Sequence, residues 1–163
     1  EANEIVIGGM LGMLESLGIW AEAVELLKAT ASRSRPNVIN YASVASACAK
    51  GQKWEICIGL LQELHEGAAI PDTIFLSAVI SACERAFEWQ RAIALLAGMN
   101  EFDPVAISST MLACNKVGRW DMALALYQEV GRYEDHWQSD DIISVAGAGL
   151  RACAEGGLWQ QAL

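Results

Sequence analysis

The sequence predicts an all-α protein, an α–α superhelical solenoid of about five helix-turn-helix repeats. Three features recur together along the chain: a regularly spaced tryptophan, a cysteine six residues before most of these tryptophans, and a small residue three positions after each. The tryptophans are Trp20, Trp54, Trp89, Trp120 and Trp159. Because these three features keep the same spacing relative to one another, the sequence is internally repeated. A repeat of about 35 residues is typical of one supersecondary unit.

The segment before each tryptophan is predicted to be an amphipathic helix. In the second unit Tyr41, Val44, Ala45 and Cys48 are apolar at positions i, i+3, i+4 and i+7, which form one face of an α-helix. The same spacing recurs at Ile7, Met10, Leu11 and Leu14; at Leu76, Val79, Ile80 and Cys83; at Ile107, Thr110, Met111 and Cys114; and at Ala146, Gly149, Leu150 and Cys153.

A second helix is predicted to begin at each tryptophan, because the apolar spacing restarts there. It runs through Trp54, Cys57, Ile58 and Leu61; Trp89, Ala92, Ile93 and Leu96; and Trp120, Ala123, Leu124 and Tyr127. Prolines lie between units (Pro36, Pro71, Pro104) and glycines between the two helices of a unit (Gly51, Gly118, Gly156 and Gly157). A single hairpin cannot bury its apolar face, so neighbouring hairpins must stack.

These elements divide the chain, taken as one helical-repeat domain, into repeats at about 4–37, 38–72, 73–103, 104–142 and a truncated 143–163. The link from Arg132 to Asp141 is acidic, and we expect it to be a solvated loop. Trp137 in this link has no place in the repeat; it either covers a small local core or anchors a partner. The chain has no initiator Met and ends inside a second helix, so we expect it to be a piece of a longer protein.

Composition argues against several function classes. The net charge of −9 repels polyanions at long range, and the longest apolar run, Ile5 to Leu14, is too short to cross a bilayer. Five cysteines without a CxxC pair suggest neither a disulfide framework nor a zinc site. His65 and His136 have no partner at ligand or catalytic spacing, so we expect no enzyme activity and no metal or other cofactor.

The face of each first helix opposite the core carries a second stripe, which we call the outer row. Its members share one order, a branched apolar residue, then mostly small residues, then a cation. They are Ile39, Ala42, Ser46 and Lys50; Ile74, Ser77, Ser81 and Arg85; and Val105, Ser108, Leu112 and Lys116. The outer row is predicted to bind a ligand, although cations near helix C-termini are also favoured by the helix dipole alone.

The segments from Ile80 to Arg85 and from Trp89 to Ala92, with Pro71 and Asp72 opening the unit, resemble pentatricopeptide repeats, in a Cys-then-Trp variant like that of algal and other protist members. The likeness covers almost the whole chain. Tetratricopeptide repeats, which have a similar length, fit less well because their early Trp and Gly–Tyr signature is missing.

The resemblance implies a right-handed superhelix that binds single-stranded RNA, one base per repeat, in an organelle, either chloroplast or mitochondrion. It places base-choosing residues at Gly8, Ala42, Ser77, Ser108 and Gly147, with second positions at Asn37, Asp72, Asp103 and either Asp141 or Ile142. It makes Ile39, Ile74 and Val105 base-sandwiching residues, and Lys50, Arg85 and Lys116 phosphate contacts. Ala42, Gly8 and Gly147 depart from the Asn, Thr or Ser of members that select bases well, so only Ser77 with Asp103 forms a strong pair, which would favour guanine.

Two functions therefore remain open. The first is an organellar RNA-binding module. The second is a protein scaffold, an accessory subunit of a large organelle assembly such as a ribosome or a photosynthetic complex. The acidic charge and the degenerate base-choosing residues favour the scaffold, whereas the conforming central units favour RNA.

Overall fold

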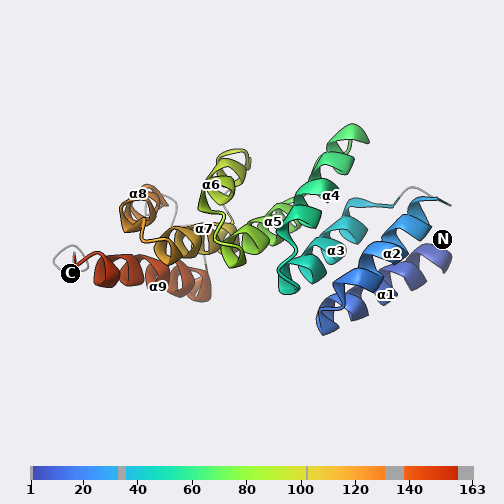
Figure 1. Cartoon of the computed structure of the whole chain (residues 1–163), viewed down its shortest axis with the longest axis horizontal. Coiled ribbons are helices and arrows are strands. Elements are labelled where there is room, and N and C mark those ends of the chain that lie inside the picture. Colours follow the sequence, from blue (N-terminus) through green and yellow to red (C-terminus); the bar gives the residue numbers. More distant parts are fainter. Residues whose placement is uncertain (1, 33–35, 102, 131–137, 158–163) are drawn as a thin grey trace. The chain divides into compact units, whose positions relative to one another are not determined.

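The computed structural model of the chain describes residues 2–32, 36–101, 103–130 and 138–157, and within these ranges it contains nine helices and no strand (Figure 1). The predicted all-α class is confirmed. The helices are α1 (Ala2–Leu17), α2 (Trp20–Ala31), α3 (Val38–Lys50), α4 (Trp54–Glu66), α5 (Thr73–Arg85), α6 (Trp89–Ala97), α7 (Pro104–Lys116), α8 (Trp120–Val130) and α9 (Ser139–Glu155).

The helix boundaries follow from local chemistry. The helices α2, α4, α6 and α8 each begin at a repeat tryptophan, as predicted. Asn37, Asp72 and Asp103 cap α3, α5 and α7, because each side-chain oxygen accepts a hydrogen bond from a backbone N–H in the first turn. Pro104 stands in the first turn of α7, where its missing N–H costs no helical hydrogen bond.

The hairpin turns share one backbone geometry. The residue two positions before each repeat tryptophan has a positive φ: Gly18, Gln52, Phe87, Gly118 and Gly157, at 69°, 57°, 64°, 74° and 68°. Left-handed backbone favours glycine, and three of the five are glycine. Gly51 and Gly156, also predicted to follow the first helix of their units, are the C-cap residues of α3 and α9, with φ of −81° and −79°.

Contacts between helices divide the chain into two compact units, residues 1–82 and 83–163. In the first unit α1 packs against α2 and α3, and α3 also packs against α2 and α4. In the second unit α7 packs against α6, α8 and α9, and α8 packs against α9. In both units, therefore, a first helix contacts its own second helix and a neighbouring first helix (Figure 1).

The repeated residue columns meet inside these contacts. All five cysteines are buried, as are the small residues three positions after the described tryptophans, namely Ala23, Cys57, Ala92 and Ala123. The tryptophans themselves are half-buried. Trp20 lies against Gly51 at the end of α3, and Trp120 lies against Gly156 at the end of α9. The thiols thus lie in the core, whereas these two tryptophans lie at joints between consecutive hairpins.

Cations cover two of these half-buried tryptophans. Lys53 Nζ lies 5.1 Å from the centre of the Trp20 ring, and the Arg119 guanidinium lies 4.8 Å from the centre of the Trp89 ring. The same guanidinium is held by Asp121, whose carboxylate accepts hydrogen bonds from Nε and Nη2, and this pairing raises the pKa of Arg119. Each cation comes from the hairpin that follows the tryptophan, so the two contacts tie consecutive hairpins together.

The predicted acidic link is shorter than the sequence suggested. The helix α9 begins at Ser139, so Asp140 and Asp141 lie in its first turn, and the Asp141 carboxylate accepts a hydrogen bond from the Gln138 backbone N–H at 3.3 Å. The expectation of a loop up to Asp141 was wrong because carboxylates near a helix N-terminus favour helix formation. Trp137, Trp159 and His136 lie outside the described residues.

Because the thiols are buried, we predict that the protein loses stability at alkaline pH. Burial raises the pKa of Cys83 and of Cys114 from 9.0 to about 11. Below pH 9 both thiols are protonated in the folded and the unfolded chain, so their contribution is complete. Between pH 9 and about 11 only the unfolded chain ionises, so the free energy of unfolding should fall.

Urea unfolding at a series of pH values across this window measures the decline. The double variant Cys83→Ala, Cys114→Ala should decline less steeply than the parent chain, since its unfolded state gains no thiolate at these positions. An equal slope in both proteins would contradict the assignment.

Candidate functional site

In the first unit, the structure brings four predicted base-facing residues together. Ile39 at the start of α3 and Ile74 at the start of α5 are 67% and 70% exposed. Between them lies a small hollow of about 80 Å³, which Ala42 and Asp72 also line. We call this cavity the Ile39–Ile74 hollow. Its remaining lining residues are Glu15, Ser43 and Ser46.

The residues of the hollow have distinct chemistry. Two branched apolar side chains and the buried Ala42 supply apolar surface, and Ser43 and Ser46 add hydroxyl groups. Asp72 uses Oδ1 to accept a hydrogen bond from the Phe75 N–H at 2.8 Å, which fixes its carboxylate at the start of α5. Such a cavity suits a small flat group with an apolar face and a polar edge.

The predicted base-choosing serines are buried rather than presented to solvent. Ser77 Oγ donates to the Thr73 carbonyl at 2.7 Å, and Ser108 Oγ donates to the Val105 carbonyl at 3.1 Å. Both residues are less than a tenth exposed. A ligand would therefore meet hydroxyl groups whose protons are already engaged within the helix.

The other predicted base-facing residues lie at helix starts. Asp103 accepts from the Ala106 N–H through Oδ2 at 3.0 Å, so it caps α7 as Asp72 caps α5. Val105 in the first turn of α7 is 53% exposed, like the isoleucines in the equivalent places. The capping aspartates have a local structural role whether or not they contact a ligand.

The three predicted phosphate-facing cations differ in their surroundings. Lys50 Nζ donates to the Glu15 carbonyl oxygen at 2.8 Å, at the end of α1. Lys116 Nζ forms an ion pair with Glu84 at 2.6 Å and lies 5.5 Å from the centre of the Phe87 ring. Arg85 is exposed and makes no ion pair or side-chain hydrogen bond with the described part of the chain.

Two residues of the hollow, Ser43 and Glu15, were not predicted from the sequence, and Glu15 brings a charge. Glu15 belongs to neither predicted stripe, and it reaches the hollow because α1 packs beside α3. The only hint in the sequence is its neighbour Ser16, which lies four residues before Trp20 as Lys50 lies four residues before Trp54. A carboxylate at this position opposes the binding of a phosphate close by.

The described residues hold no group of three or more His, Cys, Asp or Glu side chains placed to bind a metal ion. His65 is exposed near the end of α4. Within the same ranges, no helix combines the length and the apolar character that a membrane span requires.

No protein-family model and no curated protein matches the chain.

Proposed function

We propose that the chain is a helical-repeat module of the pentatricopeptide type, without catalytic activity, that binds single-stranded RNA through its outer row. Consecutive hairpins stack through their first helices in the first unit (α1 with α3) and in the second (α7 with α9). This arrangement supports a solenoid, in which each repeat contacts its neighbours. By the resemblance, the protein acts in an organelle, chloroplast or mitochondrion.

The Ile39–Ile74 hollow is the observation that carries the proposal. Two equivalent residues of consecutive repeats flank one cavity, and the predicted base-choosing pair of that repeat, Ala42 and Asp72, lines it. A nucleobase between the isoleucines would bury both of its faces against apolar side chains, and its polar edge would face Asp72 and the serine hydroxyls. RNA-binding repeats that recognise one base each present this kind of slot.

The test is RNA binding by the double variant Ile39→Glu, Ile74→Glu. Fluorescence anisotropy with labelled single-stranded RNA of about 12 nucleotides, at low salt, measures the affinity. We expect a loss of about tenfold or more, because both walls of the slot become charged and repel the backbone phosphates.

A matched control is Ile143→Glu in α9, since Ile143 is 67% exposed and lies off the outer row. This variant changes the net charge in the same direction and should retain most of the affinity. If the control and the double variant lost the same affinity per added charge, the proposal that a base binds between Ile39 and Ile74 would be wrong.

A second candidate function, a protein scaffold, is favoured by the state of the cations. Lys50 and Lys116 are engaged with α1 and with Glu84, and Glu15 lines the hollow. Of the three predicted phosphate contacts, this leaves Arg85 to meet a phosphate without first breaking an interaction. An exposed apolar row with few available cations also suits a polypeptide partner.

Arg85 separates the two candidates. If RNA is the ligand, Arg85→Gln should weaken binding about equally for all RNA sequences and lower the salt slope by about one. Arg91→Gln on α6, another exposed arginine, serves as the control. An unchanged slope in Arg85→Gln would favour the scaffold.

A further inference from the structure

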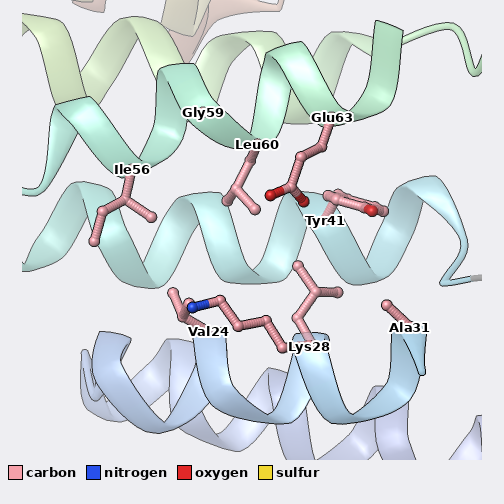
Figure 2. Close-up of a pocket in the computed structure, with 9 residues that line it drawn as sticks. Val24, Lys28, Ala31, Tyr41, Ile56, Gly59, Leu60 and Glu63 are labelled. Carbon is pink, nitrogen blue, oxygen red and sulfur yellow. The ribbon is translucent and has the colours of Figure 1, made fainter. Parts of the chain in front are cut away.

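A second and larger cavity lies in the first unit, away from the outer row. It occupies about 250 Å³ between α2 and α4, and α3 forms its floor (Figure 2). Val24 and Lys28 reach it from α2, Tyr41 from α3, and Leu60 and Glu63 from α4. It shares no lining residue with the Ile39–Ile74 hollow. We call it the α2–α4 groove.

The groove exists because α2 and α4 both pack on α3 but are not in extensive contact with each other within the described residues. A glycine widens it. A Cβ added to Gly59 of α4 would meet no atom within 4 Å, so the α4 wall is open at this point. Gly59 lies inside α4, where glycine costs roughly 1 kcal/mol relative to alanine.

Both walls present side chains at helical spacing. On α4, Ile56, Gly59, Leu60 and Glu63 stand at positions i, i+3, i+4 and i+7. On α2 the residues Val24, Leu27, Lys28 and Ala31 have the same spacing. The side chains on α2 and α4 thus form two rows that contain apolar residues. A further helix can pack into a groove between two such rows.

The charges around the groove are mostly negative. Figure 2 shows Lys28 and Glu63 extending into the space from opposite walls. Lys28 already pairs with Glu25 at 3.7 Å, whereas Glu63 makes no ion pair or side-chain hydrogen bond with the described residues. On α4 two further carboxylates flank the lining residues, since Glu55 stands four residues before Gly59 and Glu66 three residues after Glu63. Glu22 lies on the opposite face of α2, two residues before Val24.

We propose that the α2–α4 groove binds a basic amphipathic helix of a partner protein. Its apolar face would fill the space between Val24, Ile56 and Leu60, and its lysine or arginine side chains would meet Glu63 and the acidic residues beside it. A helix is the fitting occupant because it satisfies its own backbone hydrogen bonds, and helical walls have no free backbone groups to offer an extended peptide.

The proposal is tested with a labelled synthetic peptide of about 14 residues, built of leucine and lysine at amphipathic spacing. Its counterpart with glutamate for every lysine is the comparison peptide. Fluorescence anisotropy on the full chain should give a dissociation constant at least tenfold lower for the lysine peptide, because the groove is apolar and its rim is acidic.

Variants locate the site. Gly59→Leu should weaken binding of the lysine peptide at least tenfold, because its side chain would extend from the open α4 wall, where a Cβ meets no atom within 4 Å. The matched control is Gly9→Leu in α1, also a helical glycine with open space at its Cβ, which should bind as the parent chain does. Glu63→Lys should weaken binding more than Glu129→Lys, a charge reversal on α8.

The outcomes decide the proposal in either direction. A loss confined to Gly59→Leu and Glu63→Lys, with unchanged circular dichroism spectra, supports it. Equal binding of the lysine and glutamate peptides, equal losses in Glu63→Lys and Glu129→Lys, or full affinity in Gly59→Leu would overturn it, since the peptide would then bind elsewhere or by net charge alone.

Discussion

Replacing Phe75 by alanine will lower the free energy of unfolding by about 3–5 kcal/mol. Phe75 in α5 is completely buried and heads the largest fully buried side chains of the described residues. Its removal costs the transfer energy of an aromatic ring and leaves a cavity that rigid helices cannot close. For a chain of this size the melting temperature should fall by about 6–20 °C.

Urea unfolding followed by circular dichroism measures the effect. The neighbouring variant Ile74→Ala is the control, because Ile74 lies on the same helix but is largely exposed, and it should change stability by no more than about 0.5 kcal/mol. Similar values for the two variants would mean that Phe75 does not lie in the core.

Alanine at Gly51 will destabilise the first unit by about 1–3 kcal/mol, although alanine usually stabilises chains relative to glycine. A Cβ at this position would lie 2.3 Å from Cδ1 and 2.9 Å from Cγ of Trp20. Because φ of Gly51 is −81°, the backbone suits any residue, and the cost comes from the indole alone. Trp20 would have to move away from the end of α3 and from Lys53.

Gly12→Ala provides the opposite result in the same unit. Gly12 lies inside α1 with no atom within 4 Å of its Cβ position, so alanine should stabilise the chain by up to about 1 kcal/mol. Thermal unfolding of both variants gives the sign of each effect. A stabilising Gly51→Ala would show that Trp20 does not pack where the structure places it.

Helices and turns could be predicted from the sequence because both depend on residues close in the chain. The i, i+3, i+4 spacing marks a helical face, and the tryptophans mark the start of every second helix. The burial of Asn40, Phe75, Ala106 and Val145 was not predicted. These residues occupy equivalent places in α3, α5, α7 and α9 on neither predicted stripe, and such burial depends on how helices stack rather than on the pattern within one helix.

The candidate site was predictable in its apolar part only. Ile39, Ile74 and Val105 are exposed, in keeping with a row that could meet a ligand. The state of the polar residues could not be predicted, because Lys116 pairs with Glu84 from another repeat and Ser77 bonds within its own helix. The α2–α4 groove left no signal in the sequence, since its width depends on the distance between two helices that flank a third.

The uneven contacts between hairpins have a mechanical consequence. Within the described residues, first helices meet first helices, as α1 meets α3 and α7 meets α9, whereas α2 and α4, like α6 and α8, share no extensive contact. In the first unit the two hairpins are therefore held together at α3, and among the described residues no comparable contact joins α2 to α4. A change of angle that spreads α2 from α4 breaks few contacts, so an occupant between these two helices would fix the angle between their hairpins.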